Sequence, residues 1–182
     1  MTKITAKQNI RLMIEIALFA SITAVLAQVS IPLPSGVPIT LQTFAAALAG
    51  CYLGWKYGLT SVFVYIVLGA VGLPVFASLR GGFAVIAGAT GGFIIGFLPL
   101  AALCGLSASL RNKAAAVSVA LSGLVICHAG GILWFSFITS TALLPAAMLV
   151  SLPYLIKDVI SVIAALYISA AVKAVIGKIT GR

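Results

Sequence analysis

The sequence predicts an all-α integral membrane protein, a single domain over residues 1–182 built as a bundle of six transmembrane helices with both termini in the cytoplasm. Three observations lead to this class. Of the 182 residues, 63% are hydrophobic and only 7% are charged, whereas soluble domains average about 25% charged residues. The apolar runs are continuous, while the strands of a membrane β-barrel would alternate polar and apolar residues. Most basic residues fall on one side of the predicted spans.

The same composition excludes several classes of protein. A chain with so few charges could not cover its surface in water, which excludes a soluble enzyme, a disordered tail and a nucleic-acid binder. The three cysteines stand alone in apolar runs and are interpreted as small buried hydrophobic residues. No catalytic or metal-binding motif occurs, so we expect no enzymatic activity, no metal and no cofactor.

Pro, Gly and interfacial residues delimit the spans in chain order. The first span ends at the Pro-rich stretch 31–38, and the second ends at the aromatic and basic residues 55–58, which are typical of a membrane interface. The third ends at Pro74, the fourth follows the Gly-rich stretch 73–93, and the fifth follows the basic stretch 111–113. A spanning helix needs about 20 residues, so the second and third are short. The predicted spans are about residues 9–29, 40–54, 59–72, 91–110, 114–139 and 148–176.

The basic residues predict the orientation. With the N-terminus in the cytoplasm, all of them except Arg80 and Lys157 fall on the cytoplasmic side, as the positive-inside tendency requires. These two exceptions lie toward the outer face and need another explanation. The cytoplasmic set is Lys3, Lys7, Arg11, Lys56, Arg111, Lys113, Lys173, Lys178 and Arg182.

The two carboxylates of the chain have different surroundings. Glu15 lies four residues after Arg11 near the end of the first span, a spacing that favours an interfacial ion pair. Asp158 lies toward the outer end of the last span, where an ionisable group is costly and by default functional. It could bind a ligand or form an internal pair with Lys157 or Arg80. Neighbouring helical positions point about 100° apart, so Lys157 and Asp158 need not satisfy each other. We favour a ligand for both.

Glycines and prolines gather on the predicted outer side, in residues 30–43 and 73–93. Irregular backbone at membrane depth survives only where protein or a cavity satisfies it. A helix that begins near Thr90 and Gly91 would direct N–H groups toward a polar or anionic group. The weaker alternative is close helix packing through small residues.

A stripe of small residues runs along the first span at three- and four-residue spacing. Small residues on one face let another helix approach closely. The neighbour could be internal or a separate protein, and the spacing does not decide between them. The stripe consists of Ala17, Ala20, Ala24 and Ala27.

Three further residues stand out within the spans: Gln28, His128 and Trp134. A lone histidine without other metal-type ligands is more often a hydrogen-bonded core group than a ligand. Trp134 could be an interface anchor or an aromatic wall. Gln28 receives no assignment from the sequence.

Four stretches together form a recognisable pattern: Ile31–Thr43, Gly72–Ala77 with Gly81 and Gly82, Gly88–Phe93 and Leu152–Asp158. In order and spacing, these stretches resemble the BioY family, the biotin-specific substrate-binding (S) components of energy-coupling-factor (ECF) transporters. The likeness covers nearly the whole chain. One departure is that Lys157 precedes the aspartate, whereas the family often carries Gly there and Lys three residues after it, where this chain has Ser161. Ala89 also replaces a common Pro.

The resemblance implies a six-helix protein of the cell membrane that captures biotin from outside, with a transmembrane coupling protein and two ATP-binding subunits as partners. Ala20 and Ala24 would contact the coupling protein. With biotin as the ligand, Asp158 can accept hydrogen bonds from the ureido N–H groups, and Lys157 or Arg80 can neutralise the carboxylate. We favour Lys157, because a helix-borne amine is better held than a side chain in a Gly-rich loop. Neutral hydrogen bonds and apolar walls would come from Gln42, Thr43, Thr90, Gly91, Phe76, Tyr154 and Trp134.

Two alternatives from other classes remain. A stand-alone proton-coupled carrier for a small carboxylate-bearing vitamin would use Asp158 as its proton site. It would be expected to carry an inverted repeat, which the sequence does not display. A structural assembly subunit without a ligand would explain only the alanine stripe.

Overall fold

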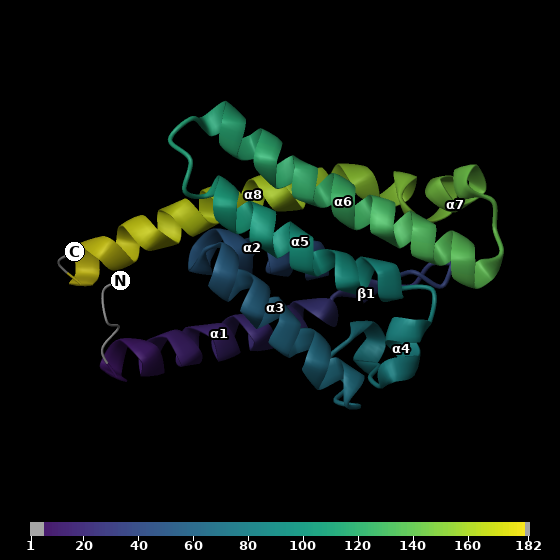
Figure 1. The fold of residues 1–182 in the computed structure, drawn as a ribbon, viewed down its shortest axis with the longest axis horizontal. Helices are drawn as coiled ribbons and strands as arrows, with labels where there is room; N and C mark the ends of the chain where they lie inside the picture. The colour runs from purple at the N-terminus through teal and green to yellow at the C-terminus, as the bar shows by residue number, and fades with distance from the viewer. Residues whose placement is uncertain (1–5, 181–182) are drawn as a thin grey trace.

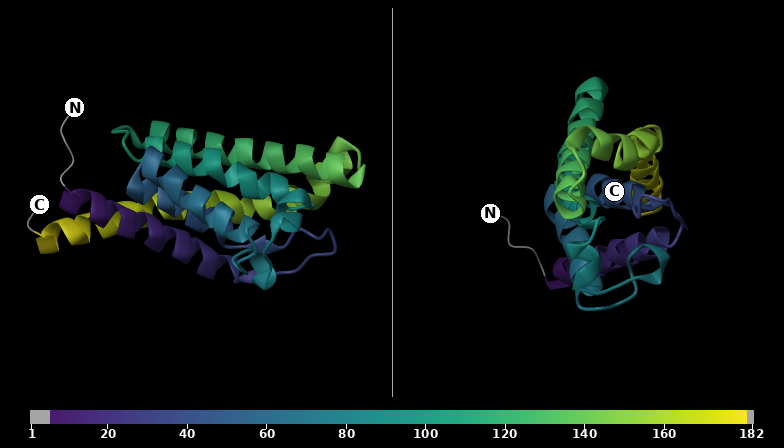
Figure 2. Two further views of the ribbon diagram at one scale, coloured as in Figure 1. Left: turned by 60° about the horizontal axis from the view of Figure 1, so that its bottom comes forward. Right: turned by 90° about the vertical axis from the view of Figure 1, so that its right-hand side faces the viewer.

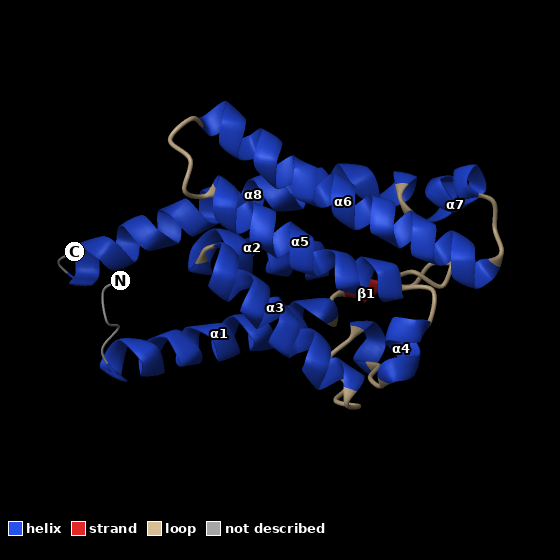
Figure 3. Cartoon of the chain, viewed as in Figure 1, coloured by secondary structure: helices blue, strands red, loops and turns tan. Residues whose placement is uncertain are grey.

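The structure is a computed structural model that describes residues 6–180, almost all of them helical (Figure 1, Figure 3). Helices α1, α2, α3, α5, α6 and α8 run along the long axis, whereas α4, α7 and the two short strands lie at one end. The first helix begins, and the last helix ends, at the opposite end. The elements are α1 (Ala6–Ala27), β1 (Ser30–Ile31), β2 (Ile39–Thr40), α2 (Gln42–Leu53), α3 (Trp55–Ala70), a 3₁₀ turn (Ala77–Leu79), α4 (Phe83–Ala87), α5 (Gly91–Ser107), α6 (Lys113–Thr139), α7 (Leu143–Val150) and α8 (Leu152–Thr180).

The helical membrane class is confirmed, although the helices differ in length. Three helices are long and apolar enough to cross a bilayer: α1, α6 and the part of α8 from Leu152 to Lys178. Helices α3 and α5 are apolar but shorter, and α2 has only 12 residues. The short second and third spans therefore match short helices.

Several predicted boundaries differ from the observed helices by up to four residues, and two of these differences have a clear local cause. Helix α3 begins at Trp55 rather than residue 59, because Gly54 adopts φ 83° and reverses the chain within one residue. The last long helix begins at Leu152 rather than residue 148, and the residues before it form α7. Pro153 lies in the first turn of α8 and has no N–H to continue a helix from α7.

Residues 30–43, expected as a loop, contain a small antiparallel hairpin. Ser30 pairs with Thr40, and Ile31 pairs with Ile39. This pairing returns the chain from the end of α1 to the start of α2 at the same end of the bundle (Figure 1). The hairpin therefore positions the first residues of α2.

The charges follow the predicted pattern at the end where α1 begins. Arg11 Nε lies 2.8 Å from Glu15 Oε1, which confirms the expected pair one turn apart. The starts of α3 and α6 carry Lys56 and Lys113 at this end. Lys3 and Arg182, which were assigned to the same side, lie outside the described residues.

Small residues allow the central helices to pack closely. Helices α5 and α6 lie side by side along their length (Figure 2). A Cβ atom added at Gly92 would lie 2.4 Å from Trp134 Cβ and 2.6 Å from Gly130 O. A Cβ atom added at Gly50 would lie 2.1 Å from Ala101 O, where α2 meets α5. This geometry is typical of membrane helices that associate through small residues.

The contact between α5 and α6 gives a first prediction. We expect Gly92→Ala to lower the thermal unfolding midpoint in detergent by about 5 °C, because overpacking costs roughly 1–3 kcal/mol and backbone cannot yield easily. Gly130→Ala is the matched control on the facing helix, since its added Cβ would meet nothing closer than 3.8 Å. Equal midpoints for the two variants would contradict this packing.

Candidate functional site

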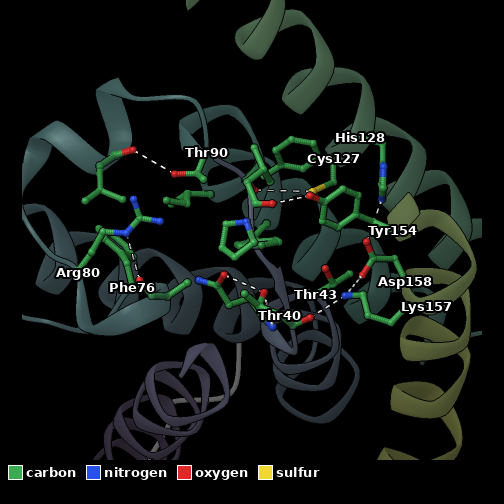
Figure 4. A pocket seen from close by; sticks show the side chains of 18 residues that line it. Thr40, Thr43, Phe76, Arg80, Thr90, Cys127, His128, Tyr154, Lys157 and Asp158 are labelled. Atoms are coloured by element: carbon green, nitrogen blue, oxygen red, sulfur yellow. Dashed lines mark hydrogen bonds and ion pairs between the residues drawn. The ribbon is translucent and has the colours of Figure 1, made fainter. Parts of the chain in front are cut away.

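A pocket lies inside the bundle at the end that carries the hairpin, α4 and α7 (Figure 4). It contains about 610 Å³ of empty space, a figure that includes open solvent at its mouth. The predicted site residues converge here from four parts of the chain. Those that line it are Gln42, Thr43, Phe76, Arg80, Thr90, Tyr154, Lys157 and Asp158.

Asp158 is the buried charge of this pocket, with 4% of its surface exposed. Its Oδ2 atom lies 3.2 Å from His128 Nε2, and its Oδ1 atom is in ion-pair contact with the Lys157 ammonium. No described residue gives Oδ1 a hydrogen bond of regular geometry. The carboxylate is thus stabilised from two sides, by Lys157 and by His128.

The Lys157 ammonium contacts the Asp158 carboxylate, although the two residues are neighbours in the helix and their side chains leave it in different directions. The internal pair that the sequence left open is therefore present. The long side chain bends back to Asp158 and also donates a hydrogen bond from Nζ to Thr40 O, at 2.6 Å. This second contact joins α8 to the end of β2. The ammonium is therefore engaged on two sides within the protein.

His128 completes the cluster from α6. It is 5% exposed, and its Nδ1 atom lies 2.8 Å from Ser151 Oγ. If the serine hydroxyl donates to Nδ1, then Nε2–H donates to Asp158, which is the arrangement of a neutral imidazole. The expectation of a hydrogen-bonded core histidine agrees with this geometry. Its place beside Asp158 was missed, because no sequence pattern links positions 30 residues apart on different helices.

The start of α2 forms a polar floor whose groups satisfy one another. Thr40 Oγ1 donates to Gln42 Oε1 at 2.9 Å, and Gln42 Nε2 donates to Tyr65 Oη at 2.6 Å. The Tyr65 ring meets Phe76 edge-on, with the ring centroids 5.6 Å apart. Thr43 lies beside Lys157 and Asp158 (Figure 4). The floor is therefore fixed before any ligand arrives.

Arg80 lies on the opposite side of the pocket from Asp158 (Figure 4). Its Nε atom donates to Ala77 O at 3.4 Å, and its terminal nitrogens make no hydrogen bond or ion pair with any residue between 6 and 180. Thr90 lies nearby and donates to Val85 O at 3.3 Å. Arg80 is the cation of this pocket that is free to meet an anion.

Tyr154 holds the hairpin loop over the pocket. Its hydroxyl donates to Val37 O at 2.5 Å. Val37 also packs in an apolar cluster with Phe135 and Val150 at this end of the molecule. The loop is therefore anchored to α6, α7 and α8.

Gly91 and Trp134 take other roles than those expected. Gly91 does not line the pocket, because it packs against the carbonyl of Ile86, where a Cβ atom would lie 1.7 Å from the oxygen. The Trp134 indole packs against Gly92 and donates from Nε1 to Gly88 O at 3.0 Å. Both residues join α5 and α6, which favours the small-residue packing alternative.

The alanine stripe of α1 lies partly inside the molecule. Ala20 and Ala27 are buried, Ala24 is half-buried against the same core, and Ala17 is exposed. Ala20 therefore has an internal neighbour within the bundle, whereas Ala24 keeps part of its surface free.

The pocket combines an acceptor end at Asp158, a free cation at Arg80 and an apolar middle that includes Phe76 and Phe97. Within residues 6–180, no group of three or more His, Cys, Asp or Glu side chains could hold a metal ion. The fold and the site thus define a membrane-embedded protein with a pocket for a small ligand at one end of its helical bundle.

Comparisons with known proteins identify the family to which this membrane protein belongs. The chain matches the BioY family over residues 1–178. It is 38% identical over 154 residues to a probable biotin transporter BioY of Pyrococcus horikoshii (85% of this chain, 91% of the relative) and 38% identical over 162 residues to the biotin transporter BioY of Rhodobacter capsulatus (81% and 85%). A crystal structure of the S-component for biotin from an ECF-type ABC transporter superposes with a TM-score of 0.85 at 27% identity, over 94% of this chain and 95% of that one. The chain belongs to the BioY family.

The Lys157–Asp158 contact gives a second prediction. In the absence of ligand, we expect Lys157→Met to lower the free energy of unfolding by about 2 kcal/mol, because a buried carboxylate loses its counter-charge. Arg80→Met should change stability by less than about 0.5 kcal/mol, since its charged atoms contact little protein.

A double-mutant cycle tests the ion pair between Lys157 and Asp158. Adding Asp158→Asn to Lys157→Met should recover part of the lost stability, because the unpaired charge is then gone. Thermal or denaturant unfolding in detergent measures the stability of the wild type, the two single variants and the double variant. A double variant as unstable as the sum of the single variants would contradict the ion pair.

Proposed function

We propose that this protein captures biotin as the substrate-specificity subunit of an ATP-driven vitamin importer in the cell membrane. The observation that carries the proposal is the pairing of a buried acceptor, Asp158, with a free cation, Arg80, across one pocket. Biotin carries two ureido N–H donors, an apolar bicycle and a tail that ends in a carboxylate. Family membership and the biotin S-component fold support the same ligand.

We place the ureido ring at the Asp158 end. Asp158 lines the pocket, its carboxylate can accept from an N–H donor, and a bond to a charged acceptor is stronger than a neutral one. Thr43 and Gln42 supply neutral polar groups beneath the ring, while Phe76 and Tyr154 supply apolar walls. The bicycle then lies between groups that hydrogen bonds already hold in place.

We place the tail carboxylate at Arg80, with Thr90 on the same side of the pocket. The sequence favoured Lys157, on the argument that a helix-borne amine is better held. The contacts favour Arg80, because the Lys157 ammonium already neutralises Asp158 and donates to Thr40. A guanidinium with unused N–H groups can bind a carboxylate through two parallel hydrogen bonds.

We further propose that the chain is one membrane domain whose six lengthwise helices each cross the bilayer, with both termini in the cytoplasm. The alternating directions of α1, α2, α3, α5, α6 and α8 support six crossings, and the basic residues at the end where α1 begins support the orientation. The pocket then opens to the outside, where the substrate of an importer arrives.

The partners proposed are a transmembrane coupling protein and two ATP-binding subunits. Helix α1 would offer its small residues around Ala20 and Ala24, with the half-buried Ala24 as the accessible part. The structural relative is described as the S-component of an ECF-type ABC transporter, which supports such an assembly.

Calorimetric titration of the purified protein with biotin tests the function. We expect tight binding to the wild-type chain and a loss of at least about tenfold for Asp158→Asn, since a charge-assisted bond is worth roughly 1.5–3 kcal/mol. Glu15→Gln is the matched control, because it removes the other carboxylate of the chain at the far end of the bundle. Absent binding to the wild type would reject the biotin assignment, and normal binding to Asp158→Asn would reject the ureido contact.

Biotin methyl ester identifies the partner of the tail. We expect Arg80→Met to lower the affinity for biotin by about tenfold and the affinity for the ester by less than about twofold, because the ester has no charge to neutralise. Lys157→Met should lower the affinity for both ligands alike, since it disturbs Asp158. The reverse pattern would place the carboxylate at Lys157.

A further inference from the structure

Gln28 makes an unusual set of contacts at the end of α1. Its half-buried amide donates from Nε2 to Ala24 O at 2.8 Å, within its own helix. The same nitrogen lies 3.3 Å from Val75 O and 3.2 Å from Phe76 O. The amide oxygen accepts a hydrogen bond from Leu79 N–H at 2.9 Å. One side chain thus bonds the backbone on both sides of a turn some 50 residues further along the chain.

The turn that Gln28 holds is strained and closed on itself. Phe76 N–H donates to Arg80 O at 2.9 Å, which brings the two ends of the turn together. Ser78 and Leu79, between them, adopt φ values of 61° and 55°, in the left-handed region that residues with a Cβ atom rarely occupy. Two consecutive residues of this kind persist only where surrounding contacts hold them. The Gln28 amide supplies those contacts to the backbone.

The two residues that flank the turn both line the pocket. Phe76 is 1% exposed and forms part of the apolar wall, whereas Arg80 is exposed at the opposite side from Asp158. Arg80 itself has one contact, to Ala77 O, that could orient its side chain. Its direction therefore depends on the conformation of the turn. Gln28 does not line the pocket.

We propose that Gln28 is a positioning residue for Arg80: by fixing the turn from 75 to 80, it directs the guanidinium toward the anionic group of the bound ligand. The inference rests on the proposed function for the identity of that group. It adds a residue from α1, outside the pocket, to the determinants of specificity for a charged tail over a neutral one.

The test uses the purified full chain, titrated with biotin and with biotin methyl ester. Gln28→Met keeps the length of the side chain and removes all of its hydrogen bonds. We expect it to lower the affinity for biotin about fivefold and the affinity for the ester by less than about twofold, because only the charged tail contacts Arg80. Ser30→Ala is the matched control, since Ser30 Oγ contacts the side chain of Ser78 in the same turn, at 3.3 Å, but none of its backbone. We expect Ser30→Ala to bind both ligands as the wild type does.

A double-mutant cycle separates positioning from general damage. In an Arg80→Met background, Gln28→Met should weaken biotin by less than about twofold further, because the group it positions is gone. Equal losses for biotin and ester, a full loss in the Arg80→Met background, or normal biotin binding by Gln28→Met would each overturn the proposal. If Gln28→Met does not fold, Gln28→Glu keeps the acceptor for Leu79 N–H and removes the donors, and the same pattern is expected. Failure of the wild type to bind biotin would reject the proposed function instead.

Discussion

A carboxylate inside a lipid-embedded bundle must be compensated from within the protein, and the architecture of this pocket depends on that constraint. At mid-span such a group costs at least about 2.5–3.5 kcal/mol. Asp158 meets the cost with Lys157 on its own helix and His128 on α6. Lys157 in turn is held by the carbonyl of Thr40, and His128 by Ser151. These contacts connect α8 to α6 and to the hairpin, and they connect α6 to the junction between α7 and α8. The neutralisation of one charge therefore also holds the walls of the site together.

The two sides of the pocket differ in how fully their polar side chains are already engaged. Around Asp158 and Gln42, side chains on long helices satisfy one another, so little ordering remains to be done when a ligand binds. On the other side, Arg80 follows a strained turn and keeps its terminal nitrogens free. The first side suits a fused ring whose polar groups have fixed positions, whereas the second side offers unused N–H groups to a charged tail.

Composition and charge placement predicted the membrane class and singled out three charged residues of the candidate site. Asp158, Lys157 and Arg80 stood out because charges at these places in an apolar chain had no topological reason, and all three line one pocket. Contacts between residues far apart in the sequence produce no periodic pattern. The hydrogen bonds of His128 and Gln28 could therefore not be predicted from the sequence. Gly91 was misplaced for a related reason, since a glycine that approaches a ligand and one that approaches a backbone carbonyl look alike in sequence.

The shortness of α2 changes the distance that a captured molecule still has to travel. With 12 residues, α2 spans about 18 Å along its axis, against a hydrocarbon core of about 30 Å. Gln42 at its first turn forms the floor of the pocket, and at its last turn Lys173 Nζ donates to Cys51 O at 2.8 Å. In the proposed orientation, a molecule bound at Gln42 therefore lies little more than three helical turns from the far end of α2, a distance shorter than the hydrocarbon core.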